Sequence, residues 1–325
     1  MDLQSKTLLI TGIGDFIGRR AAEMALERGM KVLGLEFSPE KAQLAEELGA
    51  TVHIGSTNDE LTLVEACQGA DIVFHTVSKN DASGAIDSFR AINVEGTIKT
   101  ATAAKQAGAK VFIHLSSVLV YGFHFPNCVT EDQPLVNQKN PFCQTKIESE
   151  QEVLKLNHAD KFGIIVIRAG DVYGPGGSVW VMQPLSMMQK KKFVLVNGGR
   201  GICNHIYIDN LIDGVFLAVE KEAYGEAFNL TDGGQTTWRE YYECLAEIGG
   251  YPKPVISVPA LAAKTALRQM GKKADLLPES IDFVTRSHAY SIEKATRLLG
   301  YQPRIDLAKG MERTADWLSK NNLVN

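Results

Sequence analysis

The sequence predicts an α/β fold, in which a doubly wound parallel sheet is followed by a smaller C-terminal lobe. Three observations support this prediction. Short apolar segments alternate with helical segments through the first half of the chain, which is typical of a parallel sheet covered on both faces. The first apolar segment, Leu8 to Thr11, runs into a glycine cluster, and the second, Lys31 to Glu36, ends in an acidic residue. Together these features indicate a Rossmann-type fold.

The glycine cluster predicts a phosphate site. Gly12, Gly14 and Gly18 turn the chain tightly into a helix that begins near Phe16. Glycines let the backbone approach a pyrophosphate, and the new helix directs its free N–H groups at the anion. Glu36 stands eighteen residues beyond Gly18, where a carboxylate can accept hydrogen bonds from ribose hydroxyls. An ordinary tight turn also uses glycine, but this context favours a dinucleotide.

The alternation of segments predicts the order of the remaining elements. Further strands are expected over 50–54, 71–76, 110–116 and 164–168, and helices over 18–28, 39–49, 88–107 and 142–156. Beyond Gly174 the pattern becomes less regular, with a strand over 206–208 and helices over 179–192, 210–219, 261–270, 279–284, 292–299 and 307–320. Thr237 and Glu240 form a capping box for a helix that runs to Ile248.

These elements suggest two domains. We expect residues 1–174, with 202–220 returning to them, to form an NAD(P)-binding Rossmann domain, and residues 175–201 and 221–325 to form a substrate-binding lobe. No internal repeat or low-complexity linker separates the two parts, so the lobe should pack on the sheet.

Composition limits the kinds of molecule that the protein is expected to bind. The 325 residues include 34 basic and 38 acidic ones, and the net charge of −4 gives no electrostatic reason to expect nucleic acid or an anionic membrane. Five widely spaced cysteines, without metal-ligand spacing, indicate free thiols in a reducing compartment and no metal site. No apolar segment approaches the ~18 residues of a membrane span, so we expect a cytoplasmic protein whose partner is a small molecule.

Two segments hold candidates for chemistry. Ser116 and Ser117 end the strand expected over 110–116, in the crevice where open α/β sheets bind ligands, although two serines there are also typical of a strand-ending turn. Downstream, Phe142 and Lys146 are four residues apart and share one face of a helix that opens near Asn140.

Several sequence blocks point to one family. They are 11–18, 69–75, 93–97, the Ser116-Ser117 turn with Tyr121-Gly122, and 168–175. Over nearly its whole length the chain resembles the extended short-chain dehydrogenases/reductases, also called the NAD-dependent epimerase/dehydratase superfamily. Blocks 204–210, 228–233 and 291–303 most resemble the branch of 3β-hydroxysteroid dehydrogenases and sterol-carboxylate dehydrogenases.

The resemblance implies a catalytic serine, tyrosine and lysine. Ser117 matches the serine and Lys146 the lysine, but Phe142 stands at the tyrosine position. The residues that it implies for the cofactor are Gly12, Gly14, Asp15, Phe16, Ile17, Gly18, Glu36, Ser56, Thr57, Thr76, Val77, Asn93, Lys146, Ala169 and Val172. Asp15 replaces a glycine of the family's loop, Ser56 stands where an aspartate is frequent, and Asp171 where an asparagine is common.

Phenylalanine cannot donate a proton, accept one or ionise. General acid–base catalysis contributes roughly 10²–10⁴-fold, so its loss would leave the cofactor site intact and the chemistry slow. Three explanations remain open: a substitution introduced to trap a complex, a natural homologue whose role is binding, or a different proton donor such as Ser117, Tyr121 or water.

The function expected is an NAD(P)-dependent oxidoreductase for a hydroxyl/ketone pair of an apolar substrate, sterol-like or a β-hydroxy acid, impaired by Phe142. A sugar-nucleotide epimerase/dehydratase and a catalytically silent, cofactor-binding regulatory protein are the alternatives. Glu36 favours NAD over NADP because a carboxylate repels a 2′-phosphate, whereas Arg19 and Arg20 could offset it. The resemblance also implies a homodimer that pairs through helices 88–107 and 142–156.

Overall fold

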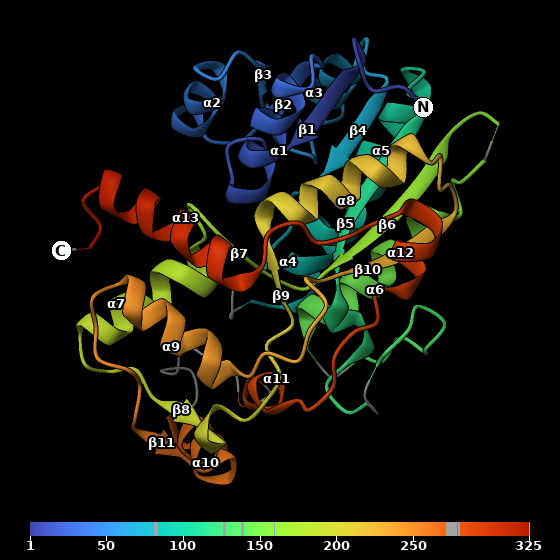
Figure 1. Cartoon of the computed structure of the whole chain (residues 1–325). Helices are drawn as coiled ribbons and strands as arrows, with labels where there is room; N and C mark the ends of the chain where they lie inside the picture. Colours follow the sequence, from blue (N-terminus) through green and yellow to red (C-terminus); the bar gives the residue numbers. More distant parts are fainter. Residues whose placement is uncertain are drawn as a thin grey trace.

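A computed structural model describes residues 1–80, 84–125, 128–137, 140–158, 160–270, 278 and 280–324. These residues form a seven-stranded, fully parallel sheet in the order β10-β6-β5-β4-β1-β2-β3 (Figure 1). Its strands are β1 (Thr7–Thr11), β2 (Lys31–Glu36), β3 (Thr51–Ile54), β4 (Ile72–His75), β5 (Val111–Ser117), β6 (Gly163–Ala169) and β10 (Glu226–Leu230). The predicted doubly wound fold is confirmed.

Helices cover both faces of this sheet. On the N-terminal side of the chain they are α1 (Phe16–Glu27), α2 (Pro39–Glu46), α3 (Glu60–Cys67), α4 (Ile86–Arg90), α5 (Gly96–Gln106) and α6 (Pro141–Leu154). A π-helical turn, Ala91–Glu95, joins α4 to α5, so the single helix expected over 88–107 contains an irregular turn. The sequence analysis did not predict helix α3. It also did not predict strand β10, which lies in the second half of the chain.

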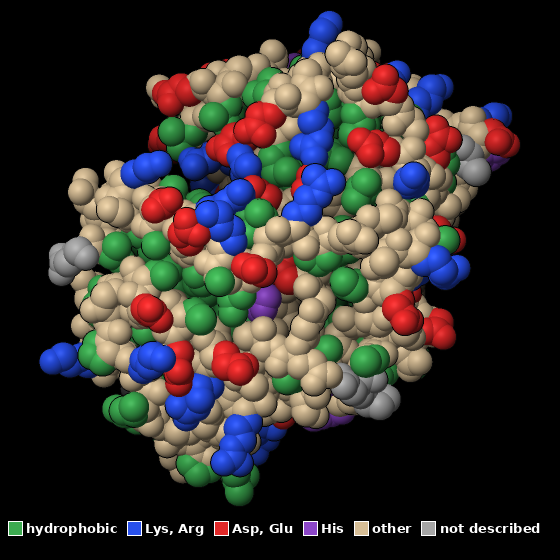
Figure 2. Space-filling view, viewed as in Figure 1, with side chains coloured by type: hydrophobic (Ala, Val, Ile, Leu, Met, Phe, Trp, Pro, Cys, Tyr) green, Lys and Arg blue, Asp and Glu red, His purple; other side chains and the backbone are tan. Residues whose placement is uncertain are grey.

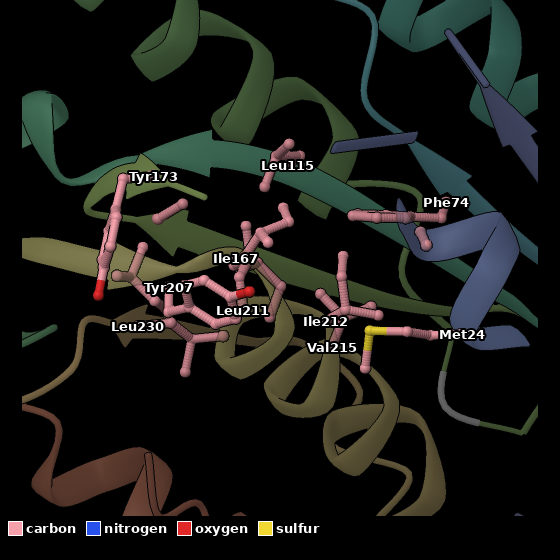
Figure 3. Close-up of a cluster of buried hydrophobic side chains, with 14 of the residues drawn as sticks. Met24, Phe74, Leu115, Ile167, Tyr173, Tyr207, Leu211, Ile212, Val215 and Leu230 are labelled. Carbon is pink, nitrogen blue, oxygen red and sulfur yellow. The ribbon is translucent and has the colours of Figure 1, made fainter. Parts of the chain in front are cut away.

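The sheet separates two apolar cores because successive strand residues point to opposite faces. In β1, Leu8 and Ile10 join one core while Leu9 joins the other. The first core lies beneath α1 and α8 (Ile208–Glu220), which pack together over the same face. Figure 3 shows α8 directing Leu211, Ile212 and Val215 toward the sheet. A helix from the second half of the chain, α8, therefore packs on the sheet that the first half forms.

Most of the remaining elements form a lobe beside the carboxyl ends of the strands (Figure 1). They are α7 (Gln183–Gln189), α9 (Trp238–Ile248), α10 (Ala260–Met270), α11 (Ser280–Thr285), α13 (Leu307–Lys320) and the strand pairs β7 (Asp171–Tyr173) with β9 (His205–Tyr207) and β8 (Leu195–Val196) with β11 (Ser257–Val258). Helix α12 (Glu293–Leu299) instead packs on β10 and α8 at the edge of the sheet. The predicted capping box opens α9. Glu279, the first residue of another expected helix, lies outside the described residues.

Candidate active site

The glycine loop between β1 and α1 leaves no room for larger residues. Gly12 has a φ of +71°, and a Cβ there would lie 3.1 Å from Thr76 Oγ1 and 3.2 Å from Val77 Cγ2. A Cβ on Gly18 would collide with the carbonyl oxygen of Gly12. The turn is therefore as tight as the sequence predicts, and it places α1 directly behind the loop.

The first turn of α1 is open to an anion. Its N-cap residue, Asp15, makes no side-chain hydrogen bond to the helix, so the capping interaction that usually satisfies the first N–H groups is not made. The Asp15 carboxylate instead lies 2.5 Å from Lys41 Nζ. This hydrogen bond raises the pKa of Lys41, and burial opposes the shift. Lys41 thus partly neutralises the charge that Asp15 adds to the loop, and the free N–H groups fit a pyrophosphate.

Glu36 holds the loop from the end of β2. Its Oε2 accepts a hydrogen bond from Gly14 N at 3.0 Å, and its Oε1 accepts from Phe37 N and Ser38 N at 2.9 and 3.1 Å. A carboxylate offers about four lone-pair sites, so one remains after these three contacts. The carboxylate therefore fixes the turn and still has one lone-pair site that could accept a further hydrogen bond.

Ser117, Phe142 and Lys146 lie at the carboxyl end of β5. Ser117 is half-buried, and its Oγ accepts from Leu119 N at 3.2 Å. Lys146 is buried and donates from Nζ to Leu115 O at 2.7 Å, two residues before Ser117 on the same strand. The Phe142 ring centroid lies 5.9 Å from that Nζ. Lys146 therefore connects the strand that carries Ser117 to the helix that carries Phe142.

Burial changes the protonation of Lys146. It lowers the pKa of this amine to about 8, although the nearby Glu150 carboxylate opposes the shift. Asn140 fixes the start of α6 by accepting from Phe142 N at 2.9 Å and Cys143 N at 3.3 Å. Because Phe142 is in the first turn of α6 and Lys146 one turn later, both side chains lie on the same face of this helix.

The other residues predicted to bind the cofactor lie in several different elements. Thr76 and Val77 follow β4 against Gly12, Ala169 ends β6 in register with Ser117, and Val172 lies in β7. Ser56 and Thr57 follow β3. Asn93 is fully buried: its Nδ2 donates to Lys79 O and Thr145 Oγ1, and its Oδ1 accepts from Lys79 N. These contacts make Asn93 a tether between the segment after β4 and α6.

The Tyr121 hydroxyl is not available as a proton donor to a substrate, because it is buried and already hydrogen-bonded. The residue is buried, its hydroxyl donates to Asn229 Oδ1 at 2.8 Å, and it accepts from Arg168 Nη1 at 2.6 Å. Burial raises its pKa, which Arg168 opposes. Arg168 in turn forms a buried ion pair with Glu150 of α6, at 2.8 Å. Tyr121, one of the alternative proton donors, is therefore held in a buried hydrogen-bond network.

Two buried histidines, His75 and His114, pair in register on the neighbouring strands β4 and β5. His75 bonds through Nδ1 to Thr11 Oγ1 and through Nε2 to Thr97 Oγ1, both at 2.9 Å. Its ring stacks on His114 with centroids 5.9 Å apart. Burial lowers the pKa of His75 to about 3, and the nearby Lys146 charge adds to the shift. Both observations indicate a neutral imidazole.

Acid should therefore destabilise the protein through His75. In the unfolded chain a histidine binds a proton near pH 6.5, whereas the folded site binds it only near pH 3. The stabilising contribution is complete above pH 6.5 and is lost as the pH falls toward 3, at about 1.4 kcal/mol per pH unit. The variant His75→Gln keeps two hydrogen-bonding groups but does not titrate. Between pH 6.5 and 4, its free energy of unfolding in urea should therefore fall less steeply than that of the native chain, by about 1.4 kcal/mol per pH unit. An unchanged slope would contradict the neutral assignment.

A cavity of about 490 Å³ adjoins the glycine loop, and its lining includes Gly14, Phe16, Gly176, Tyr207 and Trp317. Figure 2 shows basic and acidic side chains crowded around a hollow between α1 and α13. Arg20 contacts Asp209 at 2.7 Å and Glu23 at 2.8 Å, and Arg313 reaches the same aspartate at 3.1 Å. Arg20 is thus already paired with two carboxylates in the wall of this cavity.

Comparison with known proteins identifies the family. The family model described as "NAD dependent epimerase/dehydratase family" matches residues 8–231, more than half of the chain. The chain belongs to this family. Among the residues that the structure describes, no group of three or more His, Cys, Asp or Glu side chains is placed to hold a metal ion, and no helix is long and apolar enough to cross a membrane.

Family members with oxidoreductase names are among its relatives. A 4-hydroxy-2-methyl-3-oxo-4-farnesyl-3,4-dihydroquinoline-1-oxide ketoreductase of Stigmatella aurantiaca is 29% identical over 93% of this chain and 94% of that protein. A decarboxylating sterol-4-alpha-carboxylate 3-dehydrogenase of Dictyostelium discoideum is 26% identical over 94% and 99%. The UDP-glucuronic acid 4-epimerase of Bacillus cereus, solved with NAD, shares the fold with a TM-score of 0.78 and 22% identity, over 97% of this chain and 99% of that one.

Sequence reasoning missed two features of the site. Lys41, the partner of Asp15, carries a weak signal in the sequence, since it lies in the first turn of the helix that follows Glu36. Arg286 forms a buried pair with Asp171 at 2.5 Å, and nothing in the sequence relates these residues, which are more than a hundred positions apart.

Proposed function

We propose that this chain is an oxidoreductase that binds NAD across the glycine loop and acts on a hydroxyl/ketone pair of an apolar substrate. The observation that carries the proposal is the buried Lys146 amine, which joins the end of β5 to α6 beside Phe142. The family of the chain and the oxidoreductase names of its relatives support it. The test is whether restoring a hydroxyl in Phe142→Tyr restores NAD-linked oxidation of secondary alcohols.

Each residue has a proposed role. The first-turn N–H groups of α1 would hold the pyrophosphate, and the free lone pair of Glu36 would accept from the adenine ribose. Lys146 would hold the nicotinamide ribose, and Ser117 would orient the substrate oxygen. NAD supplies the hydride acceptor when it is bound. Phe142 supplies only an apolar surface beside Lys146, so proton transfer must rely on Ser117 or water.

The proposed cofactor is NAD because the Glu36 carboxylate sits where a 2′-phosphate would meet a negative charge. Replacing Glu36 with the similarly shaped glutamine should reduce the preference for NAD over NADP by roughly tenfold, the value of one hydrogen bond to a charged group. Titration of both cofactors by protein fluorescence measures this.

A matched control is Glu40→Gln, an exposed carboxylate in the first turn of α2 that does not contact the loop backbone. It should leave the preference unchanged. Tighter binding of NADP than NAD by the native chain, or an unaltered preference in Glu36→Gln, would contradict the cofactor assignment.

Phe142 favours one second candidate, a cofactor-binding protein without turnover. The tight glycine turn supports a pyrophosphate site, whereas the one position at which the family's acid–base group is expected carries a hydrocarbon ring. In this reading NAD binding changes the behaviour of the chain toward another molecule, and Phe142→Tyr gains no activity.

A further inference from the structure

Two neighbouring segments of the lobe concentrate positive charge. Residues 190–200 and 251–270, here called the basic tip, contain seven basic residues and no acidic one, although the whole chain has a net charge of −4. The two segments lie together because β8 and β11 pair in parallel, with Leu195 beside Ser257. The sequence analysis expected no anionic membrane as a partner because it summed charge over the whole chain, and that sum conceals the local excess.

Most of these charges have no carboxylate partner. Lys264 pairs with Asp282 at 2.5 Å, and Lys253 lies 3.4 Å from Glu243. The other five basic residues are exposed and form no ion pair with a carboxylate in the part of the chain that the structure describes; they are Lys190, Lys191, Lys192, Arg200 and Arg268. Near an anionic lipid surface, each free lysine or arginine strengthens binding by about fivefold.

Large aliphatic side chains stand among these charges. Val255 and Ile256 directly precede β11, and Leu261 and Met270 lie at the two ends of α10, a helix in which no residue is buried. All four are exposed, Val255 by 81% and Leu261 by 74%. A single exposed apolar residue is ordinary, whereas four in one basic region indicate a surface that contacts something both apolar and anionic.

The place of the basic tip in the molecule favours a bilayer over other anionic partners. β8, β11 and α10 form the end of the lobe that is remote from the sheet (Figure 1), and Figure 2 shows basic and apolar side chains side by side there. A protruding end can enter a headgroup layer, where aliphatic groups leave water and cations meet phosphates. Nucleic acid fits less well, because Phe193 and Tyr251, the aromatic residues of the tip, are partly buried and offer bases little surface for stacking. Two tips face to face would repel each other.

A hollow in the basic tip suits a headgroup phosphate. Its volume is about 560 Å³, and its lining includes Gly198, Arg200, Ser257 and Ser287. Ser257 Oγ accepts from Gly198 N at 2.7 Å, which leaves its own O–H free to donate. Arg200 and Ser287 are exposed, so a phosphate oxygen can replace the water on their donors.

We propose that the basic tip binds the surface of an anionic lipid bilayer. Its exposed aliphatic side chains enter between the headgroups, and its free lysines and arginines contact the lipid phosphates. Such a contact is peripheral, and it needs no spanning helix. The inference goes beyond the proposed function, because it requires neither NAD nor a substrate.

The test is co-sedimentation of the full chain with two kinds of vesicle, one of phosphatidylcholine alone and one of equal parts phosphatidylcholine and phosphatidylglycerol. The anionic vesicles should bind at least about tenfold more tightly, and added sodium chloride should weaken that binding. Equal affinity for both vesicles, or binding to neither, would overturn the proposal. So would tighter binding of single-stranded DNA than of anionic vesicles, or self-association through the tip in light scattering without vesicle binding.

A charge variant assigns the binding to the basic tip. The triple variant Lys190→Gln/Lys191→Gln/Lys192→Gln changes only exposed side chains, and it should weaken binding to the anionic vesicles by about a hundredfold. The matched control, Lys31→Gln/Lys110→Gln/Lys161→Gln, makes the same change in net charge at exposed lysines near the amino ends of β2, β5 and β6, and it should keep most of the affinity. An equal loss in both variants would contradict the role of the tip.

An apolar variant tests the entry of aliphatic side chains. Val255→Ser/Ile256→Ser leaves every charge in place, so it should weaken binding to the anionic vesicles by roughly tenfold or more while the salt dependence is kept. Unchanged affinity in this variant would contradict the entry of these side chains into the headgroup layer.

Discussion

Phe142→Tyr is expected to raise the rate of NAD-linked oxidation of secondary alcohols by roughly 10²–10⁴-fold, the usual value of general acid–base catalysis. The ring that would carry the new hydroxyl has its centroid 5.9 Å from Lys146 Nζ. A neighbouring ammonium lowers the pKa of a phenol, so the new hydroxyl could exchange a proton with the substrate near neutral pH. The measurement is NADH formation at 340 nm with a panel of secondary alcohols that includes apolar 3-hydroxy acids.

The double variant Phe142→Tyr/Lys146→Met is the control for this gain. It keeps the phenol and removes the cation, so it should lose most of the added rate. A single variant that is no faster than the native chain, while it still binds NAD, would reject the dehydrogenase reading and favour the cofactor-binding protein without turnover.

The second large effect is expected at the buried pair of Arg168 and Glu150. Glu150→Ala leaves the guanidinium buried without its carboxylate and should lower the free energy of unfolding by about 3–5 kcal/mol. The Glu150 side chain is 1% exposed and that of Arg168 6%, so water cannot replace the lost partner. Urea unfolding followed by circular dichroism measures the change.

A surface pair provides the comparison. Glu312→Ala removes the partner of Lys309, whose side chain is about half exposed, and should cost less than about 1 kcal/mol. A similar loss in both variants would show that the buried pair adds nothing beyond an ordinary surface contact.

The fold could be predicted because local sequence signals mark the same element boundaries as the observed sheet and helices. Apolar runs, glycine turns and helix caps all marked the same boundaries, as at Thr237, where the capping box is present. The short helix α3 was missed since its eight residues carry little amphipathic pattern, and β10 was missed since Glu226 and Asn229 interrupt its apolar character. Both are held by tertiary packing, which a local pattern does not report.

The candidate site could be predicted only where neighbours in sequence are neighbours in space. The glycine loop and the Phe142–Lys146 face follow from spacing along one strand or helix. The Asp15–Lys41 and Asp171–Arg286 pairs join different elements, and their partners are selected by the three-dimensional path of the chain. The pair of Arg20 and Asp209 likewise joins residues that are far apart in the sequence.

The origin of α8 and β10 in the second half of the chain has a consequence for synthesis on the ribosome. The face of β5 and β6 that α8 covers, and the edge of β6 that β10 pairs with, are made many residues before their partners. During translation this apolar face and open strand edge stay uncovered until about residue 230 has emerged. Chaperones that bind nascent chains, and proteases that cut incomplete ones, would meet the protein in that interval, and a slow stretch of codons between 170 and 230 would lengthen it.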